Sequence, residues 1–149
     1  MRPAGVCGVR LAAGRVRLPV WECAAQGATI SRMSRRILIV DDHAGFRASA
    51  RRMLEAGGFE VAGEAENVAA ARVAVGELTP DAVLLDVQLP DGDGIELATE
   101  LSANGNAPAI VLCSSRGADE LGPGLQRSGA QGFLTKDELS PAAIRELLG

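Results

Sequence analysis

The sequence ILIVDD at residues 37–42 decides the fold, because four consecutive apolar residues end in two carboxylates. Continuously apolar runs of this length are typical of strands that helices cover on both faces of a parallel sheet. Two further runs of this kind, AVLL at 82–85 and AIVL at 109–112, follow after segments with helical patterns. Strands that alternate with helices in this way predict an α/β domain.

Two weaker, mixed runs complete the expected sheet, at residues 61–65 and 132–135. Mixed polarity is typical of edge strands, so we expect a flavodoxin-like, doubly wound, five-stranded parallel sheet in the order 2-1-3-4-5 with helices on both faces. Helices are expected over 43–56, 67–76 and 94–102 and from Ser140 onward. The helix near 119–128 should be short or displaced, because Gly122-Pro123-Gly124 interrupts it.

Four of the five expected strands end in a polar or ionisable side chain. The carboxyl ends of parallel strands form the ligand-binding edge of such a sheet, so these side chains should converge. Carboxylates held together repel one another unless a cation neutralises them, and an all-oxygen site favours Mg²⁺. We therefore expect a divalent ion among the acids of this set, which comprises Asp41, Asp42, Asp86, Ser114 and Lys136.

The same set suits phosphoryl transfer. Asp86 is the best candidate for the nucleophile, and the Ser114 hydroxyl and the Lys136 ammonium would stabilise the equatorial oxygens. Lys136 is the only lysine in a chain with 14 arginines, which indicates that a compact point charge is needed at this position.

Five motifs in order resemble the receiver domain of two-component response regulators, and the resemblance covers residues 36–149. It implies that Asp86 accepts a phosphoryl group from a histidine kinase or phosphotransfer protein and that Asp41 and Asp42 hold Mg²⁺. It also implies that Ser114 bonds the phosphate and that Lys136 neutralises it. The backbone carbonyl of Gln88 would complete the metal site, and Phe133 would be the aromatic switch position. The motifs are residues 37–42, 84–86, 89–94, 110–115 and 129–136.

Asp137 follows the lysine where many family members have a proline in a cis peptide. Together with Asp41-Asp42-His43, this resembles the subfamily usually fused to helix-turn-helix outputs. Because the chain stops at Gly149, we expect a stand-alone receiver and a phosphoacceptor rather than a turnover enzyme. The alternative is a binding module or phosphate sink that transmits no switch. An aspartyl-phosphate hydrolase fits less well, since Gln88 stands where such enzymes usually carry a second acid.

Several residues also have plainer interpretations. His43 is expected to be an exposed surface residue rather than a metal ligand. Asp91 and Asp93 are expected to form a turn followed by a helix cap rather than a calcium loop. Cys113 should be a small buried hydrophobe, and Phe133 could be ordinary edge-strand core.

The net charge of −4 is unevenly distributed, since residues 1–36 carry +6 and residues 37–149 carry −10. An acidic body disfavours direct nucleic-acid binding, and no stretch is apolar enough to span a membrane. Residues 1–34 are expected to be a disordered basic extension before a receiver domain at 35–149, with Met33 as an alternative start and Trp21 as an anchor if the extension docks on a partner. Three cysteines at no metal-ligand spacing fit the cytoplasm.

Overall fold

The computed structural model describes residues 34–149, of which Arg35–Gly149 form one compact unit. The expected basic extension, with Trp21 and the alternative start at Met33, lies outside the described residues apart from Ser34. Within residues 34–149, no helix combines the length and the apolar character that crossing a bilayer requires.

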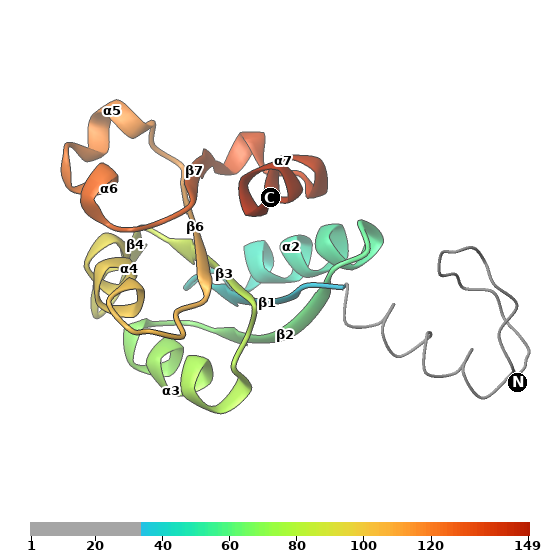
Figure 1. Cartoon of the computed structure of the whole chain (residues 1–149). Coiled ribbons are helices and arrows are strands. Elements are labelled where there is room, and N and C mark those ends of the chain that lie inside the picture. Colours follow the sequence, from blue (N-terminus) through green and yellow to red (C-terminus); the bar gives the residue numbers. More distant parts are fainter. Residues whose placement is uncertain (1–33) are drawn as a thin grey trace, which may run out of the picture. The chain divides into compact units, whose positions relative to one another are not determined.

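Five parallel strands form the central sheet, in the order β2-β1-β3-β6-β7. This confirms the predicted order 2-1-3-4-5, and all five strands lie where the sequence placed them (Figure 1). The strands are β1 (Arg36–Val40), β2 (Glu60–Ala65), β3 (Ala82–Asp86), β6 (Ala109–Ser114) and β7 (Gly132–Thr135).

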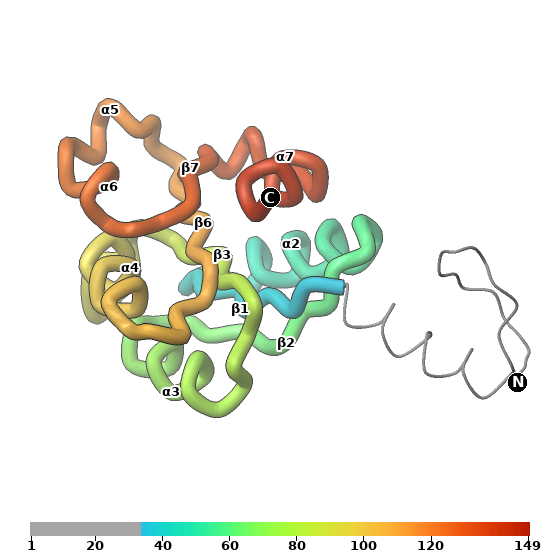
Figure 2. The backbone as a smooth tube through the Cα atoms, in the orientation of Figure 1, coloured from blue at the N-terminus to red at the C-terminus, as the bar shows by residue number. Residues whose placement is uncertain are grey.

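Helices cover both faces of the sheet, as the tube in Figure 2 shows. On one face, Ile37, Ile39 and Leu84 of the strands pack with helices α2 (Ala44–Ala56) and α7 (Pro141–Leu148). On the other face, Leu38, Val40 and their neighbours pack with α3 (Val68–Leu78) and α4 (Gly94–Ser102). This alternation explains why the central strands are apolar at every position.

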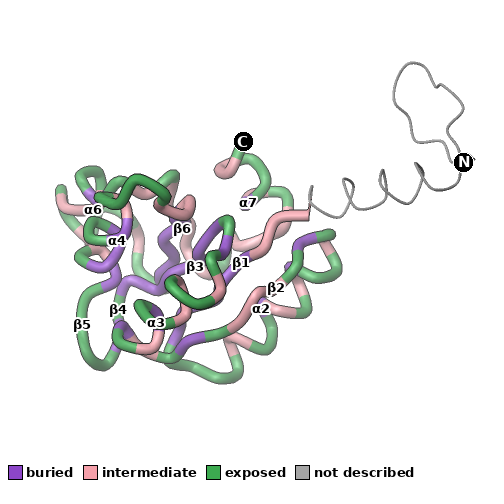
Figure 3. Tube along the Cα trace, turned by 60° about the horizontal axis from the view of Figure 1, so that its bottom comes forward, coloured by how far each residue is buried: buried purple, intermediate pink, exposed green. Residues whose placement is uncertain are grey.

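Burial falls from the centre of the sheet to its edges (Figure 3). Every residue of β3 is buried, whereas β7 is half-buried throughout and β2 has a single buried residue. The mixed runs are therefore the edge strands, as predicted. Between β3 and α4, the short strands β4 (Gln88–Leu89) and β5 (Gly92–Asp93) form an antiparallel pair.

Side-chain caps begin several of the helices. Asn67 accepts a hydrogen bond from the Ala70 amide at the start of α3, and Ser140 accepts one from the Ala143 amide at the start of α7. Both caps were predicted. The predicted end of α3 at Gly76 was wrong: the helix runs to Leu78, and the left-handed residue that closes it is Thr79, with φ of 44°. Pro80 follows directly and lacks the amide that a further turn would need.

The interrupted helix near 119–128 is two separate single turns, α5 (Ala118–Leu121) and α6 (Gly124–Arg127). Gly122 lies between them with φ of 81°, a left-handed conformation that suits glycine. The prediction of a short element is confirmed. The chain then returns through β7 to a 3₁₀ turn, η1 (Lys136–Glu138), before α7.

Candidate functional site

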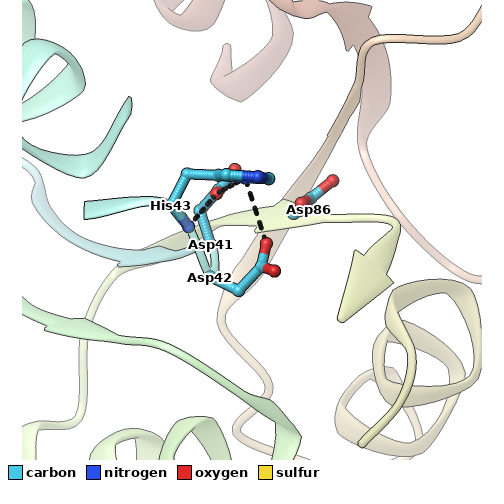
Figure 4. A group of neighbouring side chains, drawn as sticks. All are labelled: Asp41, Asp42, His43 and Asp86. Carbon is cyan, nitrogen blue, oxygen red and sulfur yellow. Dashed lines mark hydrogen bonds and ion pairs between the residues drawn. The ribbon is translucent and has the colours of Figure 1, made fainter. Parts of the chain in front are cut away.

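The ends of β1 and β3 bring three carboxylates together at one edge of the sheet. Oxygens of Asp41, Asp42 and Asp86 and one ring nitrogen of His43 all lie within 4.8 Å of one another (Figure 4). Asp41 is fully buried and Asp86 is 6% exposed. The pairing of β1 beside β3 is what makes these sequence-distant acids neighbours.

Asp41 is held through every polar group that it carries. Its amide donates to the Ala65 carbonyl at 3.0 Å. Oδ1 accepts from the His43 amide at 2.8 Å, and Oδ2 accepts from Lys136 Nζ at 2.6 Å. Its carbonyl oxygen accepts from Arg47 Nη1 at 2.6 Å. A buried carboxylate needs such partners, and these bonds fix its position.

Lys136, the residue directly after β7, also contacts this cluster. Its ammonium lies 2.6 Å from Asp41 Oδ2 and 3.7 Å from Asp86 Oδ2. It also lies 4.3 Å from the centre of the Phe46 ring, within cation–π range. Burial would lower the pKa of Lys136, but the hydrogen bond to Asp41 and the charges of Asp86 and Asp41 raise it above the usual value. Lys136 is therefore a permanent cation of the cluster.

Of the two buried acids, Asp86 has fewer compensating contacts than Asp41. Burial raises the pKa of this carboxyl to about 6, the charge of Asp41 adds to the rise, and Lys136 opposes it. Its Oδ1 atom accepts a long hydrogen bond from the Gln88 amide, at 3.4 Å. The raised pKa thus reflects burial first and the repulsion from Asp41 second, and Lys136 offsets these two effects only in part.

This charge balance and the oxygen donors fit a hard divalent cation. Asp41, Asp42 and Asp86 would hold such an ion, and Mg²⁺ prefers oxygen ligands and keeps several waters. The ligand role of the Gln88 carbonyl stays a prediction, although its amide contact places the Gln88 backbone beside Asp86.

His43 is 71% exposed, in agreement with the expected surface position. Its Nδ1 atom nevertheless lies 3.2 Å from Asp41 Oδ1 and 3.1 Å from Asp42 Oδ1, so the ring contacts both acids. His43 was predicted to stand outside the cluster because it was placed in the first helical turn and because oxygen-rich Mg²⁺ sites rarely recruit imidazole. His43 is instead the extended residue that precedes α2.

Ser114 is buried at the end of β6, which neighbours β3 in the sheet. Its Oγ atom accepts a hydrogen bond from the Arg116 amide at 3.1 Å. Phe133 lies on β7 opposite Leu112, half-buried against the core that includes α3 and α4. The structure thus places both residues on the strands expected for them, and their roles stay predictions.

The plainer interpretations of three residues are confirmed. Asp93 caps α4 by accepting from the Ile95 amide at 2.7 Å. Asp91 accepts from the amides of Val68 and Ala69, so it binds the start of α3, a contact that the local sequence did not reveal. Cys113 is buried, and burial raises the pKa of its thiol to about 12.

A cleft of about 350 Å³ opens beside the loops that follow β3 and β6. Its lining includes Gln88 and Asp93 from the segment after β3 and Arg116 and Glu120 from the segment after β6. The cleft thus borders the loops that follow Asp86 and Ser114.

Comparison with known proteins adds independent findings. The family model described as the response regulator receiver domain matches residues 37–148. The chemotaxis protein CheY of Bacillus subtilis is 38% identical over 104 residues, which are 70% of this chain and 87% of that protein. The chemotaxis protein CheY of Halobacterium salinarum is 35% identical over 112 residues, 75% of this chain and 92% of the other. The solved structure of a LuxR-family two-component response regulator from Aurantimonas is 32% identical, with a TM-score of 0.69, covering 77% of this chain and 85% of that one.

Proposed function

Because this chain belongs to the response regulator receiver domain family, we propose that it is a phosphoacceptor that takes a phosphoryl group on Asp86 in the presence of Mg²⁺. The donor would be a histidine kinase or a phosphotransfer protein. The chain would act as a signalling switch in the cytoplasm and would bind a downstream protein rather than nucleic acid. It would take part in its own phosphorylation and dephosphorylation without being a turnover enzyme.

The observation that carries this proposal is the electrostatic state of Asp86. Its carboxyl has a pKa raised to about 6 and lies beside a second buried acid, with the Lys136 ammonium 3.7 Å away. Structural acids are usually paired or hydrogen-bonded so that their pKa falls, whereas a strongly perturbed group in such a cluster indicates a functional site.

The chemistry follows from the side chains. An Asp86 carboxylate oxygen attacks the phosphorus of a phosphohistidine, so an O–P bond forms while the N–P bond breaks and the imidazole nitrogen keeps the electron pair. Mg²⁺, when bound, would supply positive charge to the transferred group. The Lys136 ammonium, now 2.6 Å from Asp41 and 3.7 Å from Asp86, would turn to the phosphoryl oxygens, and the Ser114 hydroxyl would donate to one of them.

Incubation with Mg²⁺ and acetyl phosphate tests the proposal. We expect intact-protein mass spectrometry to show one added phosphoryl group, and we expect none for Asp86→Asn or in the presence of EDTA. Asp119→Asn is the matched control, because it removes an exposed acid outside the cluster. An acyl phosphate that still forms on Asp86→Asn, or one that forms equally well in EDTA, would contradict the proposal.

A second candidate function rests on the broken segment of α5 and α6. If these two turns do not respond to phosphorylation, the domain would act as a phosphate sink or a constitutive partner. The phosphorylation chemistry would be the same in both cases, so only a measurement of the conformational response separates them.

A further inference from the structure

Arg47 connects the acidic cluster to the edge of the sheet. Its side chain is only 17% exposed. Nη1 donates to the Asp41 carbonyl oxygen at 2.6 Å, and Nε donates to Glu64 Oε1 at 3.0 Å. Glu64 lies on edge strand β2, one residue before Ala65, whose carbonyl accepts the Asp41 amide. Strand β2 thus holds the Asp41 backbone twice, once directly and once through Arg47.

The carbonyl that Arg47 binds lies just past the end of β1, which stops at Val40. The peptide unit is planar, so fixing this oxygen also fixes the amide of Asp42 and the direction in which the chain leaves the strand. A hydrogen bond from a guanidinium is stronger than one between neutral groups. Arg47 therefore restrains the turn that carries two of the three acids.

Glu64 in turn keeps Arg47 in place. Its Oε1 accepts from Arg47, and its Oε2 accepts from Arg51 Nε at 2.8 Å. Arg51 also lies 3.4 Å from Glu55, so its guanidinium is directed along α2 and away from the end of β1. The two arginines thus share one carboxylate, and Arg47 is the one that bonds to Asp41. This difference provides a matched pair of cations for an experiment.

We propose that Arg47 is a positioning residue for the divalent-cation site, acting through the Asp41 carbonyl. It holds the peptide between Asp41 and Asp42 in the orientation that directs both carboxylates at the ion. The inference rests on the proposed function in one respect, namely that these acids bind Mg²⁺.

The sign of the effect separates positioning from simple charge. Arg47 is a cation near a cation site, so its removal would strengthen Mg²⁺ binding if only long-range electrostatics mattered. Loss of the restraint on the turn would weaken Mg²⁺ binding instead, because the carboxylates would have to be ordered when the ion binds.

The experiment is an Mg²⁺ titration of the full chain followed by the backbone amide NMR signals of residues 41–43 and 86–88. We expect Arg47→Gln to weaken Mg²⁺ binding by about fivefold to tenfold, the size of effect that loss of one charge-assisted hydrogen bond can produce. Arg51→Gln removes the same charge and a bond to the same glutamate, but no bond to Asp41. Its Mg²⁺ affinity should therefore stay within about twofold of that of the wild type. The Mg²⁺ affinity of Arg47→Lys should lie between those of the wild type and Arg47→Gln. An ammonium can reach the Asp41 carbonyl, but it lacks the fork of the guanidinium that also holds Glu64.

A second readout needs no metal. The Asp42 amide nitrogen belongs to the peptide that Arg47 restrains, so its chemical shift should change in metal-free Arg47→Gln and not in Arg51→Gln. Mg²⁺ affinity of Arg47→Gln equal to or tighter than that of the wild type would overturn the inference alone. A wild type that binds no Mg²⁺ would overturn the proposed function and this inference with it.

Discussion

The Asp86 carboxyl is almost fully buried, belongs to a cluster of three acids, and has the Lys136 ammonium 3.7 Å away. Burial and the neighbouring Asp41 raise its pKa to about 6 from an ordinary value near 4. Between these two pH values the folded protein binds this proton more tightly than the unfolded chain does. The contribution of Asp86 to the free energy of unfolding must therefore fall as pH rises from about 4 to about 6 and stay low above that range.

This argument predicts that Asp86→Asn stabilises the metal-free protein. At pH 7.5, in EDTA, the free energy of unfolding should rise by roughly 1–3 kcal/mol, because the substitution removes a charge that the folded state disfavours. At pH 4.5 the gain should be small, since Asp86 is then largely protonated in the folded protein. Urea unfolding measures the gain in the free energy of unfolding at each of the two pH values, with Asp119→Asn as the control. Equal gains at the two pH values would count against this electrostatic account.

At the scale of elements, helix α4 begins in direct contact with the strand end that carries Asp86. Its first residue, Gly94, donates its amide to the Val87 carbonyl at 2.7 Å. A Cβ atom at this position would collide with the Asp86 carbonyl oxygen and would lie 2.9 Å from Val87 Cα. Both contacts are backbone atoms, which cannot move aside without shifting the end of β3.

Gly94→Ala is accordingly expected to lower the free energy of unfolding by about 2 kcal/mol, within the range for forcing extra atoms into a packed site. It should also slow phosphorylation by acetyl phosphate, because the shift reaches the Asp86 backbone. Gly76→Ala is the matched control: Gly76 lies inside α3, and no atom lies within 4 Å of the position that an alanine Cβ would take there. Alanine at that position should stabilise the protein by about 0.5–1 kcal/mol. If Gly94→Ala behaves like Gly76→Ala, the close packing of α4 on β3 is not a constraint.

The elements could largely be predicted because their patterns are local. Apolar runs located the strands, and Asn67 and Ser140 located the starts of two helices. The end of α3 was missed because Gly76 is a common stop signal, whereas the actual stop depends on Thr79 adopting a left-handed conformation before Pro80.

The site was predictable only in part. The acids and Lys136 could be found because each lies at the end of a strand or just after it. The contacts of Arg47, Phe46 and His43 could not be predicted. They depend on which side chains at the start of α2 and just before it face the end of β1. A polar or aromatic residue in the first turn of a helix carries no such information by itself. The regular spacing of the chain thus predicts where the cluster forms, and the packing of α2 determines what surrounds it.

At the scale of the whole molecule, one segment is held more weakly than the rest of the described fold. Turns α5 and α6 contribute no buried residue, and only their Leu121 and Leu125 pack against the core. Four backbone hydrogen bonds at the ends of these turns span three residues and are 3.1–3.4 Å long between nitrogen and oxygen. Few buried contacts and long hydrogen bonds are the features of a segment that opens locally at low free energy.

We therefore expect amides in residues 118–128 to exchange with solvent faster than those of α2, α3, α4 and α7. Because the chain breaks at Gly122-Pro123, neither turn continues into a longer helix that would resist local opening. Hydrogen exchange followed by mass spectrometry or NMR measures this directly in the unphosphorylated protein.

The same measurement with beryllofluoride and Mg²⁺, which together mimic the phosphorylated carboxylate, decides between the two candidate functions. A group bound to Asp86 would attract the Ser114 hydroxyl, which now accepts from the Arg116 amide in the loop that leads to α5. A signalling switch should therefore slow exchange across 118–128 and around Phe133, whereas a phosphate sink should show protection only at 86–90 and 114–116. Asp86→Asn with beryllofluoride is the control and should show neither change. Exchange across 118–128 that is identical with and without the mimic would favour the sink, because the weakest segment of the fold would then be insensitive to the state of Asp86.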